Sequence, residues 1–232
     1  MSAGNMASVL PVSDTAKQGP GHRHTFHFKG VKVDMFKMNR ICVFCGSHYG
    51  GHARFERAAY EVGTTLAEKK IGIVYTGGRI GLMGVLADAA LAKGGEVIGV
   101  MPRMQKSRQI AHRGLTQLIE VESRAERKEV IAEISDAFIA LPGGIGALNE
   151  LTEMALWTQI GRQAKPCGML NVSRYFDHLI AYFDLCSREG FLKPEQRRAV
   201  LDDTDLDRLL IKMRNWTPLE EADVALGVHS RG

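Results

Sequence analysis

Two glycine-rich turns constrain the fold of this chain more than any other feature of its sequence. One covers residues 75–84 (YTGGRIGLMG) and the other covers residues 141–150 (LPGGIGALNE). Each follows a short apolar run that predicts a buried strand, and each opens a stretch with helical spacing. Such a turn directs backbone N–H groups and a helix N-terminus toward one small volume, which suits a phosphate. Neither turn matches the dinucleotide-binding fingerprint or the Walker A pattern. A single glycine-rich turn is more often only a tight connection, so the prediction of a phosphate site depends on the presence of two such turns.

Strand-like and helix-like segments alternate along the chain from residue 40 onward. Helical spacing is clear in the apolar residues Phe55, Ala59, Val62 and Leu66. The alternation predicts an α/β fold of the Rossmann-like doubly wound kind, a mainly parallel sheet with helices on both faces. Ligands in such sheets bind beyond the carboxyl ends of the strands, where both glycine-rich turns should lie. The short apolar runs that predict strands are residues 40–45, 71–75, 96–101, 117–121, 136–141 and 166–170.

Both ends of the 232-residue chain lack the periodicity of the middle. We expect a disordered leader over residues 1–38, a single Rossmann-like domain over 39–216 and a flexible tail over 217–232. The net charge of +4 arises entirely within residues 1–40, which carry six Lys or Arg and two Asp. The balanced remainder gives no support for a nucleic-acid partner, and no apolar run is long enough to span a membrane.

Cysteine usage points to a reducing compartment. Four cysteines, at positions 42, 45, 167 and 186, do not form the pattern of a disulfide scaffold, so we expect a cytoplasmic protein. Cys42 and Cys45 match the C-x-x-C pattern of redox and metal sites. Their position inside an apolar run favours packing, because a redox pair normally opens a helix. The histidines of the leader have no second cluster of ligands, and we predict no metal site.

A helix with one inward-facing cation is expected after residue 123. Residues 123–126 (SRAE) form a capping-box pattern, with Ser123 as the N-cap. In that helix Arg127 falls on a stripe that is otherwise apolar, near the carboxyl edge of the sheet. A cation there needs an anion, and spacing alone leaves two candidates, a bound ligand and a structural ion pair. The adjacent Lys128 is expected to be solvated on spacing alone.

An acidic residue, Glu150, follows the second glycine-rich turn, within about the first turn of the predicted helix. The helix dipole there favours an ionised carboxylate, and an acid that only stabilises the helix would show the same pattern. A phosphate held by the backbone of residues 143–146, however, would place its attached sugar beside Glu150. Glu153 lies three residues further on, where a supporting or solvated role is favoured.

These residues resemble the Lonely Guy family of cytokinin-activating phosphoribohydrolases, many of which carry the label lysine decarboxylase. The resemblance covers roughly residues 40–216. The family's P-G-G-x-G-T-x-x-E signature matches residues 142–150, and its G-G-x-x-G-L-M-G turn matches residues 77–84. Its Arg-Lys pair at a helix start matches residues 127–128, and its opening strand matches residues 42–47 (CVFCGS). Together these motifs are specific for the family and less specific for its substrate.

The resemblance implies hydrolysis of the N-glycosidic bond of a nucleoside 5′-monophosphate, a cytokinin riboside monophosphate or an AMP-like nucleotide, to a free base and ribose 5-phosphate. It implies a homodimer with the active site at or near the subunit interface, and it makes Arg127 and Glu150 the catalytic residues. No step of this reaction requires a metal or an organic cofactor. The residues expected to bind the substrate are Gly77, Gly78, Gly81, Lys128, Gly143, Gly144, Ile145, Gly146, Ala147, Asn149 and Glu153.

The chain departs from the family pattern at several positions near the expected base and ribose. The signature threonine is Ala147, so one hydroxyl donor to the phosphate is absent, which would weaken binding about tenfold. The departures favour an alternative, a non-catalytic nucleotide- or phosphoester-binding protein similar to the molybdenum-cofactor carriers, which the intact Arg127 and Glu150 oppose. A pyridoxal-phosphate decarboxylase is disfavoured, because no lysine has a recognisable Schiff-base context. The remaining departures are Thr76, Gln109, Arg124, Ala125 and Asn149.

Overall fold

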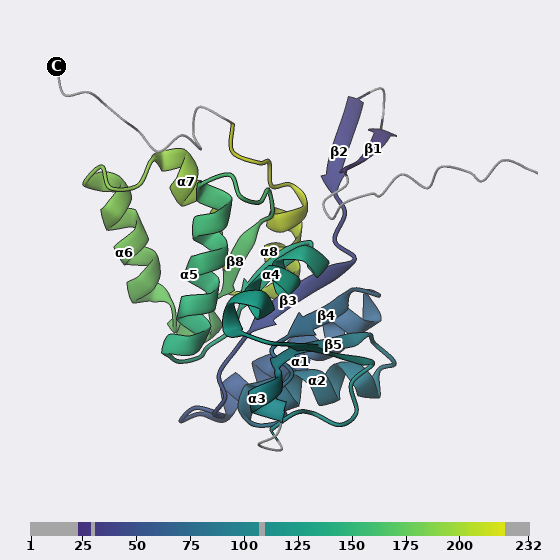
Figure 1. The fold of residues 1–232 in the computed structure, drawn as a ribbon. Coiled ribbons are helices and arrows are strands. Elements are labelled where there is room, and N and C mark those ends of the chain that lie inside the picture. The colour runs from purple at the N-terminus through teal and green to yellow at the C-terminus, as the bar shows by residue number, and fades with distance from the viewer. Residues whose placement is uncertain (1–22, 29–30, 107–109, 221–232) are drawn as a thin grey trace, which may run out of the picture.

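A parallel sheet of seven strands forms the centre of the protein (Figure 1). The computed structural model describes residues 23–28, 31–106 and 110–220. Every neighbouring pair in this sheet is parallel, in the order β6-β5-β4-β3-β7-β8-β9, which confirms the predicted fold class. Six of the strands begin and end within one residue of the predicted segments. The strands are β3 (Arg40–Phe44), β4 (Gly72–Tyr75), β5 (Val97–Pro102), β6 (Gln117–Val121), β7 (Ala137–Ala140), β8 (Cys167–Leu170) and β9 (Val200–Asp203).

The strand β9 lies at the edge of the sheet and was not predicted. Its sequence, Val200-Leu201-Asp202-Asp203, is half acidic, and Val200 is its only buried residue. An edge strand pairs on one side only, and charged side chains on it prevent pairing with other chains. Such a strand therefore lacks the apolar run that identifies the central strands.

Helices cover both faces of the sheet, as doubly wound topology requires. Successive strand residues point to opposite faces. In β3, Ile41 and Val43 belong to the core beneath α1, α2 and α8, whereas Cys42 and Phe44 belong to the core beneath α4, α5 and α6. Within the described ranges, no helix is long and apolar enough to cross a membrane. The helices are α1 (Ala53–Glu68), α2 (Gly81–Ala92), α3 (Arg103–Lys106), α4 (Arg124–Ile134), α5 (Ile145–Gln159), α6 (Asp177–Arg188), α7 (Pro194–Arg198), α8 (Leu206–Arg214) and the 3₁₀ helix η1 (Val172–Arg174).

The C-x-x-C sequence contributes to packing. Cys42 belongs to one core and Cys45 packs against the other, so the two thiols lie on opposite faces of the sheet. Both are free thiols. Burial raises the pKa of both groups, that of Cys45 to about 12. Thiols that are protonated and on opposite faces do not form a redox pair, which agrees with the packing interpretation.

An antiparallel strand pair precedes the parallel sheet and is separate from it (Figure 1). It consists of β1 (Arg23–Phe28) and β2 (Val31–Phe36). This finding corrects the expectation of a disordered leader for these residues. Two residues separate the paired Phe28 and Val31, which is a common hairpin spacing, but the interspersed His and Lys residues masked the alternation. Residues 1–22 and 221–232, which make up most of the predicted leader and tail, lie outside the described residues.

The strand order reverses at β3, and this reversal positions the site. Strands β4, β5 and β6 extend the sheet on one side of β3, and β7, β8 and β9 extend it on the other. In doubly wound sheets the crevice at such a switch point is the usual place for a ligand. The backbone N–H of Gly46, just after β3, donates to the carbonyl of Pro142, just after β7, at 3.1 Å. This bond fixes the two loops that flank the crevice.

Candidate functional site

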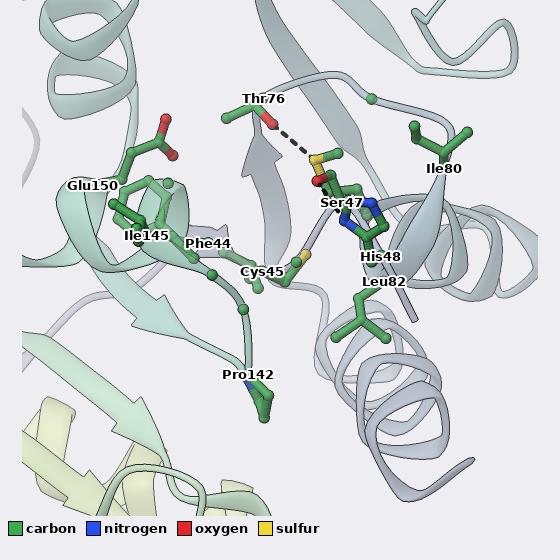
Figure 2. Close-up of a pocket in the computed structure, with 18 of the residues that line it drawn as sticks. Phe44, Cys45, Ser47, His48, Thr76, Ile80, Leu82, Pro142, Ile145 and Glu150 are labelled. Carbon is green, nitrogen blue, oxygen red and sulfur yellow. Dashed lines mark hydrogen bonds between the residues drawn. The ribbon is translucent and has the colours of Figure 1, made fainter. Parts of the chain in front are cut away.

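A pocket with a volume of about 810 Å³ opens at this switch point. Its walls come from the segments that follow β3, β4 and β7 and from the first turns of α4 and α5. Figure 2 shows Cys45, Thr76 and Pro142 beside the strand ends, with the Glu150 carboxylate directed into the space between α5 and Thr76. The two glycine-rich turns thus meet at one pocket, and its volume suits a ligand of nucleotide size.

Most of the predicted site residues line this pocket, and three do not. Gly77 and Gly81 instead shape the first turn, with φ angles of +81° and +63° that favour glycine. A Cβ atom on Gly81 would also lie 2.3 Å from the backbone carbon of Ser47. Glu153 lies one turn further along α5, outside the pocket wall. The predicted residues that line the pocket are Gly78, Arg127, Lys128, Gly143, Gly144, Ile145, Gly146, Ala147, Asn149 and Glu150.

The second glycine-rich turn presents bare backbone to the pocket. Gly143 is required by packing, because a Cβ atom there would lie 2.7 Å from the Cβ of Ala147 and 2.9 Å from the amide nitrogen of Gly46. Gly144 and Gly146 differ, since a Cβ atom on either would meet nothing within 4 Å. No side chain among the described residues caps the N-terminus of α5. The open backbone and the uncapped helix end together form a surface that suits an anion.

The predicted helix α4 begins as its capping pattern indicated. The hydroxyl of Ser123 accepts a hydrogen bond from the Glu126 backbone N–H at 3.0 Å. The Glu126 carboxylate in turn accepts from the backbone N–H of Glu122 at 2.7 Å. This cap fixes the first turn of α4, from which Arg127 reaches the pocket.

Arg127 and Glu150 form an ion pair at the pocket wall. The Nη2 group of Arg127 donates to Oε1 of Glu150, and the two side chains are 10% and 13% exposed. The Nε atom of Arg127 is buried and has no hydrogen-bond partner among the described residues. Burial raises the pKa of the Glu150 carboxyl above its ordinary value, although the positive charge of Arg127 opposes this rise. The pocket wall therefore contains a carboxylate and a guanidinium that are paired with each other, and the unused Nε donor of the guanidinium is buried.

A second ion pair lies beside the first. Lys128 Nζ donates to Oε2 of Glu153, and both side chains are about one-quarter exposed. This pair joins α4 to α5. Lys128 lines the pocket while remaining paired, rather than being solvated as its spacing suggested.

Several pocket residues were not predicted from the sequence. Ser47, His48 and Tyr49 lie in the loop after β3, and their position at the switch point was the available signal. Tyr175, which follows η1, donates its hydroxyl to the carbonyl of Gly143 at 2.6 Å. No periodicity or motif indicated this contact. In the part of the chain that the structure describes, no group of three or more His, Cys, Asp or Glu side chains is placed to hold a metal ion.

The sequence matches one protein family and its curated relatives over most of its length. A family model described as "Possible lysine decarboxylase" matches residues 83–213. An Oryza sativa subsp. japonica protein named probable cytokinin riboside 5′-monophosphate phosphoribohydrolase LOGL9 is 40% identical over 81% of this chain and 82% of its own length. The Arabidopsis thaliana protein named cytokinin riboside 5′-monophosphate phosphoribohydrolase LOG1 is 40% identical over 80% of this chain and 87% of its own length.

Solved structures share the fold at lower identity. The molybdenum cofactor binding protein of the phototrophic bacterium Rippkaea orientalis gives a TM-score of 0.55 at 22% identity, covering 75% of this chain and 94% of that one. The molybdenum cofactor carrier protein of Chlamydomonas reinhardtii gives a TM-score of 0.55 at 19% identity, covering 75% and 99%. Identities this low establish a common fold and carry no further information.

Proposed function

The chain belongs to the Lonely Guy family, the family of these Oryza and Arabidopsis phosphoribohydrolases, and we propose that it hydrolyses the N-glycosidic bond of a nucleoside 5′-monophosphate. The substrate is a cytokinin riboside monophosphate or an AMP-like nucleotide, and the products are the free base and ribose 5-phosphate. We assign the activity to the single domain over residues 39–216. The observation that carries the proposal is the convergence of the uncapped α5 N-terminus and the Arg127–Glu150 pair on one pocket.

The phosphate of the substrate binds at the second glycine-rich turn in this proposal. Gly144 and Gly146 have open space where a side chain would stand, so an oxygen atom can approach their backbone closely. The first turn of α5 adds N–H groups and the positive end of the helix dipole. Because Glu150 stands one turn further along the same helix, a phosphate at residues 144–147 places the attached ribose beside its carboxylate. Gly78 and Lys128 complete the binding wall.

Cleavage of an N-glycosidic bond develops positive charge on the ribose ring. In the proposed reaction the bond between C1′ and the base nitrogen breaks, and its electron pair leaves with the base, which takes up a proton. Water adds to C1′ and loses a proton. The ionised Glu150 carboxylate stabilises the developing charge and orients this water. Arg127 does not give up a proton at neutral pH, so it acts by holding the Glu150 carboxylate in place.

We also propose that the protein is a cytoplasmic homodimer. The four free thiols suit a reducing compartment. Leu156 near the end of α5 and Ile160, the residue that follows this helix, are 48% and 38% exposed and give a second copy an apolar surface to cover. Sedimentation analysis should give twice the 25.5 kDa mass of the chain. Replacement of Leu156 and Ile160 by Ser should give the monomer mass, and a wild-type monomer would refute this proposal.

The activity is tested by incubating the protein with AMP and with isopentenyladenosine 5′-monophosphate and measuring free base and ribose 5-phosphate by chromatography. We expect the two products in equal amounts. Retention of nucleotide without products would support the alternative, a non-catalytic nucleotide-binding protein of the same fold. Release of nucleoside and inorganic phosphate would contradict both readings, because the cleaved bond would then be the phosphoester.

A further inference from the structure

A strained connection follows β8 on the side of the sheet that holds the pocket. Ser173 has φ 51° and ψ 39°, and Arg174 has φ 66°. Both lie in the left-handed region, which non-glycine residues rarely adopt and never adopt without cost. Two such residues in succession persist only where the surrounding structure holds them. The contacts around Ser173 and Arg174 therefore show which interactions hold this strained conformation.

The buried residue Asn171 holds the strained segment in place through hydrogen bonds. The side chain of Asn171 donates through Nδ2 to Asp177 at 2.8 Å and accepts through Oδ1 from the backbone N–H of Phe176 at 2.8 Å. Its backbone N–H donates to the carbonyl of Asp203, at the end of β9, at 2.7 Å. The strained turn is thus tied to the edge strand and to the first turn of α6.

The strained turn delivers Tyr175 to the phosphate-binding turn. Its ring packs edge-on against Phe55 of α1 and against Phe176, with centroid separations of 5.5 Å and 5.1 Å. Its hydroxyl donates to the carbonyl oxygen of Gly143 at 2.6 Å. The side chain is nevertheless 44% exposed and lines the pocket. A half-exposed side chain contributes little to the packing of the core. Its hydrogen bond to Gly143 instead indicates that Tyr175 orients the glycine-rich turn.

The hydrogen bond to Gly143 controls the neighbouring amide. A peptide group is planar and trans, so the N–H of Gly144 points opposite to the carbonyl of Gly143. Fixing that carbonyl fixes the direction of the N–H at the N-cap of α5. The carbonyl of Pro142, one peptide earlier, is already held by Gly46. The peptide group between Gly143 and Gly144 has a glycine on each side. Without the hydrogen bond from Tyr175, this peptide group could rotate freely.

We propose that Tyr175 is a positioning residue for phosphate binding, acting through the orientation of the Gly144 N–H. The inference rests on the proposed function, because it assumes that a substrate phosphate binds at this turn. Tyr175 itself need not touch the substrate. The strain at Ser173 and Arg174 is then the structural cost of placing its hydroxyl over Gly143.

The test is Tyr175→Phe, which removes only the hydroxyl and keeps the packed ring. Calorimetric titration measures the Kd values of AMP, ribose 5-phosphate and adenosine, and turnover of AMP is measured in parallel. We expect the Kd values of the two phosphorylated ligands to rise about fivefold to tenfold. A change of this size corresponds to the loss of one hydrogen bond that supports the binding of a charged group. The Kd of adenosine and the melting temperature should stay unchanged. Tyr60→Phe is the matched control, because Tyr60 is an exposed tyrosine on α1 outside the pocket.

Three results would overturn the inference. They are an unchanged Kd for AMP in Tyr175→Phe, an equal weakening of AMP and adenosine, and the absence of AMP binding to the wild-type protein. If the wild-type protein binds AMP without hydrolysing it, the proposed function fails by itself, and the Kd comparison still decides the role of Tyr175.

Discussion

The carboxylate of Glu150 accepts a hydrogen bond from the guanidinium of Arg127, and both side chains are almost entirely withdrawn from solvent. One residue comes from the first turns of α4 and the other from the first turns of α5. The pair therefore couples two helix N-termini at the point where the sheet changes direction. A buried pair of this kind holds each partner in one position, which is what a reaction on a developing cation needs.

Replacement of Glu150 by Gln should lower kcat for AMP by about 100-fold or more, because the charge that faces the ribose is lost while the shape is kept. Base release followed by absorbance checks this outcome. The matched control is Glu153→Gln, which removes the same charge from a partly exposed residue that does not line the pocket. The control should keep most of its activity, and equal losses in the two variants would show that the effect is structural.

Acidification should inactivate the enzyme at a higher pH than the pH at which an ordinary glutamate carboxyl takes up its proton. Burial raises the pKa of Glu150 above that of an ordinary glutamate. The group therefore takes up its proton at a higher pH, and the ionised form that the reaction uses is lost earlier on acidification. The pH dependence of kcat/KM for AMP measures this limb. Because phosphate monoesters themselves titrate near pH 6, the profile must be compared with that of Glu150→Gln, and an acid limb that persists unchanged in the residual activity of this variant would contradict the assignment.

Restoring the family's threonine at Ala147 should strengthen phosphate binding. Ala147 lines the pocket in the first turn of α5, and a hydroxyl there supplies one more donor to the anion. We expect Ala147→Thr to lower KM for AMP by about tenfold with little change in kcat. Ala147→Val has the same shape without the hydroxyl and should give no gain. A gain in both variants would attribute the effect to packing instead.

The C-terminal end of α1 offers a gain in stability away from the site. Lys70 has φ 57°, and its N–H donates to the carbonyl of Ala67 at 2.9 Å, so it stands where helices favour glycine. We expect Lys70→Gly to raise the free energy of unfolding by about 1 kcal/mol. Denaturant titration of this variant and of Lys70→Ala tests the cause, since alanine keeps the left-handed strain and should not stabilise the protein.

The central strands and the convergence of Arg127 and Glu150 were predictable from sequence. Central parallel strands are buried on both faces and leave continuous apolar runs, and helical periodicity places Arg127 on the inward face. Strand β9 was not predictable in the same way, because an edge strand tolerates Asp202 and Asp203. Tyr175 left no signal either. Its place depends on two non-glycine residues in left-handed conformations, which tertiary contacts impose against local preference.

The most direct test of the central claim is a crystal structure of the Glu150→Gln variant with bound AMP. We predict that the phosphate oxygens lie within hydrogen-bonding distance of backbone N–H groups in residues 144–147 and that the ribose lies against the side chain of residue 150. A phosphate bound elsewhere, for example at the turn over residues 77–84, or a ribose out of reach of residue 150, would contradict the claim.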